Sequence, residues 1–356
     1  MSAALTVALP PCTDGEAAWE SGMWDLEKVP LVKEVERGPY GEARYLVNAQ
    51  GIRLATYHWP VRVEAKHKPL RGVVVLVHGY AVHITYTYFQ SNEVDPPKPY
   101  DGSWVHRMNQ EGYAVWGIDN QSCGRSEGIK EGLKMFFHRF DDLCDDVEQL
   151  CMLLKKHPVY CKYPLFLMGN SMGGNISLHV SQALHEKGLL QGTILLSPMI
   201  TINSLKSTTF NRLLLPIARV CSYFLPSMKV VVSSGRDQKH VLLHQQYEND
   251  PLNFHGAARM LVAVLTVQQC EKTVQMLDRF NFPFFILQSE HDEICDPSGA
   301  EMLYERAASK VKKLNMLSDP DSFHMLSTEP MHLEVLDEVL DWLECRLHPS
   351  NNDDSQ

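Results

Sequence analysis

The feature that most constrains the fold is a repeated alternation of strand-like and helix-like segments. It begins at residues 72–77 (GVVVLV), an uninterrupted, mostly β-branched run, typical of a strand buried on both faces of a parallel sheet. Further strands are predicted at 113–118, 165–168, 193–196, 284–287 and 313–317, and helices at 139–157, 173–187, 298–309 and 329–347. Repeated β-α units of this kind predict a mostly parallel central sheet with helices on both faces.

The rest of the chain is divided around this repeat. Strands at 44–48 and 52–59 precede it, joined by a hairpin turn at 49–51. Residues 1–40 predict a loosely ordered lead-in, and the polar tail 350–356 is expected to be disordered. The strand-helix rhythm breaks between 201 and 255, which predicts a helical cap inserted between a first core part (41–200) and a second (256–349), where helix resumes.

Composition excludes several classes of function. The net charge is −10, whereas nucleic-acid binders usually carry a basic face, and the same charge argues against electrostatic attachment to anionic membranes. No apolar run reaches about 18 residues, so no membrane-spanning helix is expected, and the first residues do not resemble a signal peptide. Nine cysteines without a CxxC pair predict reduced thiols and a cytoplasmic location.

A candidate nucleophile lies between a predicted strand and a predicted helix. Residues 169–173 (GNSMG) match G-x-S-x-G, with Ser171 at the centre. A strand–turn–helix setting is required for a nucleophile elbow, where small flanking residues relieve crowding around a strained serine. The alternative is that Ser171 only caps the helix that follows.

The elbow predicts where its partners lie, because this architecture orders the triad as serine, acid, histidine. The loop after the strand at 284–287 contains Asp292 and Asp296, with Glu290 a weaker third choice. Asp296 precedes Pro297 and a helix, so capping explains it, and Asp292 is the predicted acid. His324 lies in the loop after the last strand and is the predicted base, whereas its rival His332 falls inside a helical stretch.

The loop after residues 72–77 supplies the other expected part of the site. It reads His78-Gly79-Tyr80, and the backbone N–H groups of Tyr80 and Met172 are the predicted oxyanion hole. His78 is expected to hold this loop by hydrogen bonds.

The predicted cap contains a crowded apolar stretch. Leu213, Leu214, Ile217 and Phe224 are its candidate substrate-binding residues, with Leu215, Val220 and Leu225 beside them. Two interpretations stay open: ordinary inward-facing core positions, or walls of an apolar entrance above the nucleophile. In the second interpretation part of the surface touches a membrane peripherally.

Together these segments resemble the monoacylglycerol lipase and lysophospholipase-like family of serine hydrolases. The similarity covers roughly residues 42–345. The matching segments are His78-Gly79, 119–128, the GNSMGG elbow, Asn249-Asp250-Pro251, His291-Asp292 with Cys295, and Phe323-His324. The resemblance implies an α/β-hydrolase fold, a helical cap over an apolar acyl tunnel, and no metal or cofactor. It implies a triad of Ser171, Asp292 and His324, oxyanion donors at Tyr80 and Met172, and a cysteine near the active site at Cys295.

The sequence departs from the family at positions that bear on substrate. Ser122-Cys123-Gly124 stands where Gly-His-Gly is usual, Tyr80 is bulky, and 89–102 resembles an insertion. The expected substrates are lipid esters, monoacylglycerols or lysophospholipids. The alternatives are a small-ester esterase, an acyl-protein or acyl-CoA thioesterase, and an aminopeptidase, which would need Glu248 or Asp250 to hold the substrate amine. The sequence carries no signal for an oligomeric state.

Overall fold

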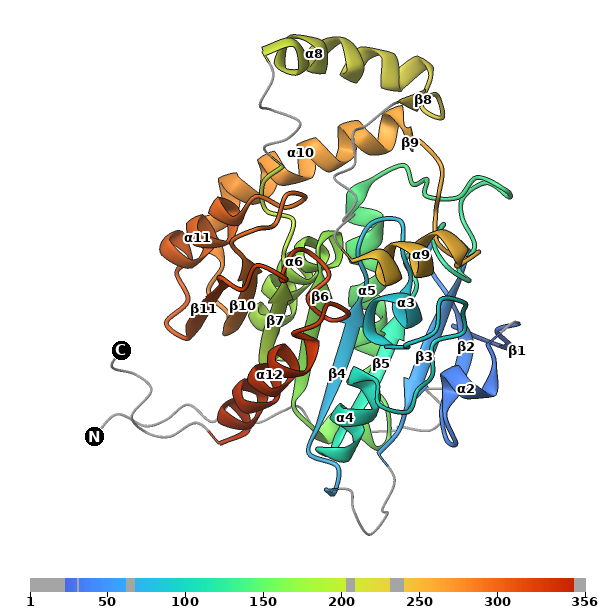
Figure 1. Cartoon of the computed structure of the whole chain (residues 1–356), viewed down its shortest axis with the longest axis vertical. Helices are drawn as coiled ribbons and strands as arrows, with labels where there is room; N and C mark the ends of the chain where they lie inside the picture. The colour runs from blue at the N-terminus through green and yellow to red at the C-terminus, as the bar shows by residue number, and fades with distance from the viewer. Residues whose placement is uncertain (1–22, 31, 62–67, 203–208, 231–239, 349–356) are drawn as a thin grey trace.

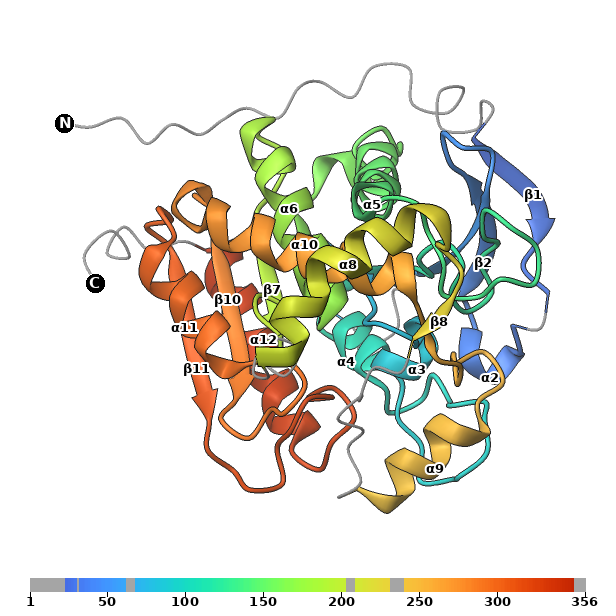
Figure 2. The same cartoon turned by 90° about the horizontal axis from the view of Figure 1, so that it is seen from above.

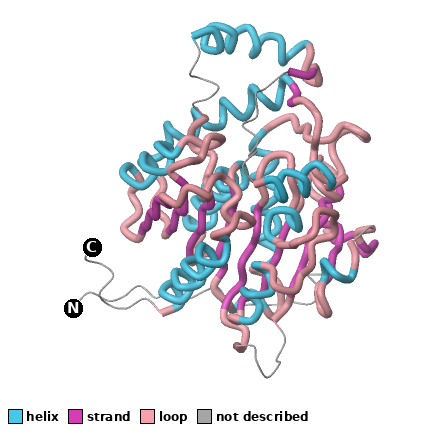
Figure 3. The backbone as a smooth tube through the Cα atoms, viewed as in Figure 1, coloured by secondary structure: helices cyan, strands magenta, loops and turns pink. Residues whose placement is uncertain are grey.

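The computed structural model describes residues 23–30, 32–61, 68–202, 209–230 and 240–348 of the 356-residue chain. Within these ranges nine strands form one sheet in the order β1-β2-β3-β5-β4-β6-β7-β10-β11 (Figures 1 and 3). Neighbours from β5 to β11 are parallel, and β1, β2 and β3 add an antiparallel edge. The bounds are β1 Trp24–Lys28, β2 Glu42–Val47, β3 Arg53–Trp59, β4 Gly72–Val77, β5 Tyr113–Ile118, β6 Leu165–Asn170, β7 Gly192–Leu196, β10 Phe284–Ser289 and β11 Lys312–Leu317.

Helices cover both faces of the sheet, as the sequence predicts (Figure 1). The described helices are α2 Glu34–Arg37, α3 Ile84–Tyr88, α4 Trp104–Gln110, α5 Phe140–Leu154, α6 Met172–Glu186, α8 Thr209–Phe224, α9 Val241–Asn249, α10 Met260–Met276, α11 Pro297–Arg306 and α12 His332–Leu347, with short 3-10 turns at Tyr160–Lys162 and Leu277–Arg279. Side chains alternate across β4: Val73 and Val75 join the apolar cluster of α5 and α6, whereas Val74 and Leu76 join that of α4 and α12. Burial on both faces explains the uninterrupted apolar run at residues 72–77.

The end of the predicted lead-in is ordered, which corrects the prediction for residues 23–40. Strand β1 pairs with β2, and α2 follows it. Glu36 in α2 is 3% exposed, accepts a hydrogen bond from Thr85 at 3.1 Å and pairs with Arg125 at 2.8 Å. This buried ion pair ties the segment to the core, and composition alone does not reveal such a long-range contact. Residues 1–22 lie outside the described ranges.

Helix α10 packs on both the cap and the core. The predicted boundary at residue 256 assigned this helix to the core alone. Helix α10 contacts α8, and Figure 2 shows α8 crossing over it. On its other side, Gln269 donates to Asn175 at 2.9 Å and Thr273 bonds His179 at 2.8 Å, both on α6. The antiparallel pair of β8 (Lys229–Val230) and β9 (Ala258–Arg259) links the end of α8 to the start of α10. The cap predicted at 201–255 therefore rests on a helix that also packs on the core. Segments 203–208 and 231–239 and the tail from residue 349 lie outside the described ranges.

Two further sequence predictions concern the membrane and the thiols. No helix in the described part of the chain is long and apolar enough to cross a membrane. Free thiols occur at Cys123, Cys144, Cys151, Cys221, Cys270, Cys295 and Cys345. Cys161 is disulfide-bonded, so the prediction of uniformly reduced cysteines is wrong at this position.

Candidate active site

Ser171 occupies the sharp turn between β6 and α6. Its backbone has φ 53° and ψ −118°, a strained conformation for a residue with a side chain. A Cβ at Gly169 would lie 2.2 Å from the Gly173 carbonyl oxygen, and one at Gly173 would lie 2.3 Å from that of Val77. The G-x-S-x-G pattern is therefore a steric requirement of the turn. Ser171 makes no side-chain capping bond to α6, so helix capping does not explain the residue.

His324 and Asp292 form a buried pair. The Nδ1 atom of His324 lies 2.8 Å from Oδ2 of Asp292, and both residues are at most 6% exposed. The acid is held in place by further donors: Oδ1 accepts the N–H groups of Ile294 and Cys295 at 2.8 and 2.9 Å, and Oδ2 accepts Nε2 of Gln288 at 3.0 Å. A carboxylate fixed in this way can orient an imidazole and stabilise its protonated form.

The competing residues have other partners. Asp296 caps α11 by accepting the Ser298 N–H at 2.9 Å, as predicted. Glu290 is exposed. His332 lies in the first turn of α12 and bonds Trp104 at 3.3 Å. Asp292 is thus the acid that contacts His324.

Cys295 brings the acid's loop to the nucleophile. Its Sγ lies 3.8 Å from the Oγ of Ser171, and the residue is 1% exposed. Burial raises the pKa of the Cys295 thiol well above its usual value, and Asp292 adds to the effect, so the thiol is neutral and a poor nucleophile. Asn170 connects the elbow to the histidine loop by donating to the His324 carbonyl at 3.4 Å. The structure therefore brings Ser171, Asp292, His324 and Cys295 into one site.

The loop after β4 passes directly beside the nucleophile. A Cβ at Gly79 would lie 3.2 Å from the Cβ of Ser171. The next residue is Tyr80, and within the described residues neither its N–H nor that of Met172 has a protein acceptor. Met172 is also the first residue of α6, where the helix dipole favours negative charge. These two N–H groups can therefore serve an oxyanion, the role predicted for them.

His78 holds this loop, as predicted. Its Nε2 accepts the Asn120 N–H at 2.9 Å, so the proton sits on Nδ1, which donates to the Gly79 carbonyl at 2.8 Å. The side chain is fully buried, and burial lowers the pKa of His78 to about 4. A neutral imidazole thus connects the β4 loop to the segment after β5.

The predicted substrate-binding residues of the cap do not all lie where expected. Leu213 and Leu214 belong to α8, but their side chains lie outside the description. Ile217 and Phe224 are 58% and 72% exposed. Helix α8 rests on the outer side of α10 (Figures 1 and 2). These two side chains therefore face outward and do not form walls above the nucleophile.

Apolar residues of α10 and of two loops, by contrast, pack toward the core. Leu261 and Leu265 of α10 pack, with Ile202 and Ile294, against the cluster that contains Met172 and Cys295. Sequence reasoning missed them because MLVAVLTV at residues 260–267 has the appearance of an ordinary core helix. A pattern of burial does not distinguish core packing from contact with an acyl chain.

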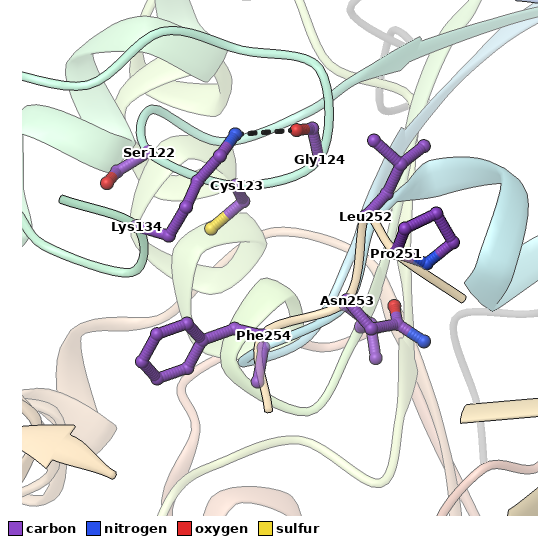
Figure 4. Close-up of a pocket in the computed structure, with 10 residues that line it drawn as sticks. Ser122, Cys123, Gly124, Lys134, Pro251, Leu252, Asn253 and Phe254 are labelled. Carbon is purple, nitrogen blue, oxygen red and sulfur yellow. Dashed lines mark hydrogen bonds between the residues drawn. The ribbon is translucent and has the colours of Figure 1, made fainter. Parts of the chain in front are cut away.

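A small cavity lies next to the oxyanion loop (Figure 4). Its lining comes from three segments: Ala81 and Val82, the segment 251–254, and Ser122-Cys123-Gly124, which differs from the family pattern. Lys134 closes one side by donating to the Gly124 carbonyl at 2.8 Å. One of the sequence differences from the monoacylglycerol lipase family, Ser122-Cys123-Gly124, thus lies next to the loop of Tyr80. Among the described residues, no group of three or more His, Cys, Asp or Glu side chains could hold a metal ion.

Comparison with known proteins identifies the family of the chain. The model of the family described as "Serine aminopeptidase, S33" matches residues 68–331. The chain is 27% identical to mouse monoglyceride lipase over 316 residues, covering 87% of this chain and 92% of the relative, and 26% identical to the Saccharomyces cerevisiae enzyme, covering 83% and 91%.

Solved structures show the same fold. A soluble variant of S. cerevisiae monoglyceride lipase in complex with a substrate analog superposes with a TM-score of 0.65 at 21% identity, covering 89% of this chain and 98% of that one. A carboxyl esterase from Bacillus coagulans superposes with a TM-score of 0.63 at 14% identity, covering 86% and 99%. The α/β-hydrolase fold expected from the sequence is confirmed.

Proposed function

Since this chain belongs to the serine aminopeptidase S33 family of α/β-hydrolases, we propose that it is a serine ester hydrolase that cleaves carboxylic esters of lipids. The observation that carries the proposal is a strained elbow serine that has the loops of the buried His324–Asp292 pair and the loop of Tyr80 beside it. This arrangement suits acyl transfer through a serine ester.

The proposed reaction uses each group in turn. His324 removes the Ser171 hydroxyl proton as Oγ attacks the ester carbonyl, and the N–H groups of Tyr80 and Met172 stabilise the negative oxygen. The tetrahedral intermediate collapses, the C–O bond to the alcohol breaks, and His324 gives its proton to the departing alcohol. Water then attacks the acyl-enzyme with His324 again as base, releasing a carboxylic acid and restoring Ser171. Asp292 stabilises the imidazolium in both halves.

We further propose a monoacylglycerol as the preferred substrate. Two findings support this choice: the mouse and yeast relatives are monoglyceride lipases, and Leu261, Leu265 and Ile294 pack against the apolar cluster to which Met172 and Cys295 belong. Each buried CH₂ of an acyl chain contributes about 0.8 kcal/mol, so such a lining favours long chains. Lysophospholipids, small esters and thioesters are the substrates to compare.

The family's description makes aminopeptidase activity the second candidate. It would require an unengaged carboxylate in the cap for the substrate amine. Asp250 is 5% exposed, bonds His83 at 3.1 Å and accepts the Leu252 N–H at 2.9 Å. The Oε2 atom of Glu248 lies 3.9 Å from Nδ1 of His255. Because these acids are engaged with histidines, the ester reaction is favoured.

The outer face of the α8 segment supports a proposal of peripheral membrane contact. Its exposed large apolar residues are Ile217, Val220, Tyr223, Phe224, Leu225 and Met228. An apolar surface on an otherwise acidic protein suits insertion into the interface of a neutral lipid surface. The abundance of free thiols keeps the cytoplasm as the proposed compartment.

The experiment that tests the function compares substrates on the purified protein. Monoacylglycerols and p-nitrophenyl esters of increasing chain length, lysophospholipids and aminoacyl p-nitroanilides are assayed beside a fluorophosphonate probe. We expect ester hydrolysis that increases with chain length, and probe labelling that disappears in Ser171→Ala. Faster turnover of the anilides, or labelling that persists in Ser171→Ala, would reject the proposal.

A further inference from the structure

Glu329 has a buried carboxylate that folds back onto the segment carrying His324. The residue is 1% exposed. Its Oε2 accepts the Phe323 N–H at 2.7 Å, and its Oε1 accepts the N–H groups of His324 and Met325 at 2.8 and 2.6 Å. Three consecutive backbone donors thus converge on one carboxylate, an anion-binding arrangement in which each hydrogen bond is charge-assisted.

The same turn is fixed from its other side. The N–H groups of Thr328 and Glu329 donate to the Met325 carbonyl at 2.7 and 3.0 Å. Ser289 donates to the Ser322 carbonyl at 2.7 Å, which ties the start of the loop to the end of β10. Ser327 donates to the Thr87 carbonyl at 2.6 Å and anchors its end to α3. Glu329 is the one ionisable side chain that these contacts place against the backbone of His324.

We infer that Glu329 is a positioning residue for the reaction: it fixes the backbone that carries His324, and its charge favours the imidazolium that forms when His324 takes the Ser171 proton. The inference rests on the proposed function, since the role exists only if His324 is the base. Local sequence does not reveal it, because Glu329 lies in a loop just before α12 and resembles a solvated acid.

Several charged or titratable groups near His324 influence the protonation of its imidazole. From the loop after β10 come Asp292, at 2.8 Å from Nδ1, and the neutral thiol of Cys295 near Ser171. Glu329 lies on the same loop as His324. The ring of the neighbouring Phe323 contacts the rings of His240 and His291. Burial raises the pKa of Glu329, while the three N–H groups and the nearby His324 act in the opposite direction. His324 therefore contacts two acids, Asp292 through its ring and Glu329 through its backbone N–H.

The test distinguishes the effect of the negative charge of Glu329 from the effect of its side-chain length. Glu329→Gln keeps the length but removes the charge and presents an NH₂ group to a backbone N–H. Glu329→Asp keeps the charge but is too short to reach all three donors. The matched control is Glu334→Gln, an exposed acid in the first turn of α12. Each is assayed for kcat, KM, pH profile and thermal unfolding with a short soluble ester.

We expect kcat in Glu329→Gln to fall by about 10- to 100-fold with little change in KM, since slight misplacement of a catalytic group has effects of this size. The acidic limb of its kcat/KM profile should move to lower pH, because a nearby carboxylate favours the protonated imidazole. Glu329→Asp should lose kcat but keep its acidic limb near that of the wild type. Glu334→Gln should match the wild type in every respect.

A folded Glu329→Gln with wild-type kcat and an unmoved acidic limb would overturn the inference, whatever its melting temperature. If that variant does not fold, wild-type kcat in a folded Glu329→Asp overturns it instead. Failure of the proposed function has a different signature: the wild type and Glu334→Gln would both lack ester hydrolysis and fluorophosphonate labelling.

Discussion

At the scale of single residues, the site distinguishes two aspartates that lie only four positions apart. Asp292 accepts three hydrogen bonds and contacts His324, whereas Asp296 accepts the Ser298 N–H at the start of α11. The two side chains are chemically identical, so their tasks follow from their partners alone.

This difference gives a prediction with a built-in control. Asp292→Asn should reduce kcat on the order of 10⁴-fold, because an amide cannot stabilise the imidazolium and can favour the wrong tautomer. Asp296→Asn should stay close to the wild type, because asparagine also caps helices well. Steady-state kinetics on a soluble ester measure both, and a larger loss in Asp296→Asn would reverse the assignment.

His78 gives a prediction about pH. Its pKa is about 4 in the folded protein against an ordinary value of 6.5, so between these pH values the unfolded chain binds more protons. The contribution of His78 to stability is therefore complete above about pH 6.5 and decreases by up to about 1.4 kcal/mol per pH unit as the pH falls toward 4.

Thermal unfolding between pH 7 and 4.5 measures this effect. His78→Gln, whose amide oxygen can accept the Asn120 N–H, should melt lower at pH 7 but lose less on acidification than the wild type. The exposed His348→Gln serves as control and should follow the wild-type curve. Parallel curves for His78→Gln and the wild type would show that His78 is not the titrating group.

At the scale of elements, two helices are involved where the sequence analysis assigned both substrate binding and membrane contact to the cap. These helices are α8 and α10. Helix α10 packs on α6, which begins directly after Ser171, whereas α8 packs on the outer side of α10 (Figure 1). The apolar residues of α8 that lie outward are available to a lipid surface.

Phe224→Ser should therefore weaken binding to neutral lipid vesicles and reduce hydrolysis of long-chain monoacylglycerol several-fold, by loss of buried apolar area at the interface. Hydrolysis of a short soluble ester and the melting temperature should change little, since Phe224 is 72% exposed. Leu333→Ser, an exposed apolar residue of α12, is the matched control. Equal losses on both substrates with a lower melting temperature would identify Phe224 as a packing residue.

At the scale of the whole molecule, the segment before the hairpin is part of the domain. Strand β1 covers the edge of the sheet, and Glu36 forms its ion pair with Arg125 where both side chains are at most 6% exposed. Arg125 belongs to the segment after β5, so the pair connects the two ends of the described N-terminal half.

Glu36→Gln should lower the free energy of unfolding by about 3 kcal/mol, because it removes the charged partner that contacts the buried Arg125 guanidinium at 2.8 Å. Denaturant unfolding measures the change. Glu34→Gln, an exposed acid of the same helix, should have an effect within about 0.5 kcal/mol. An equally small effect of Glu36→Gln would mean that solvent screens the Arg125 pair.

The sequence by itself determined the central strands of the sheet, the elbow and the division between Asp292 and Asp296. The strands at 72–77 and 113–118 were predicted to the residue, because uninterrupted β-branched and apolar runs are encoded locally. The turn at Ser171 was also predictable, because a side chain at either flanking glycine of the five-residue motif would clash with nearby backbone. Pro297 after Asp296 identified the helix cap without reference to distant parts of the chain.

Only the tertiary structure decided which distant side chains meet. Cys295 reaches Ser171 across 124 positions, and Glu36 reaches Arg125 across 89. The outward direction of Ile217 and Phe224 depends on where α8 lies on α10, and the role of Glu329 depends on how its loop closes on the backbone of His324. An apolar or acidic residue has the same local pattern whether it meets solvent, core or substrate. Its partners are set by packing between elements, and packing is a property of the whole folded chain.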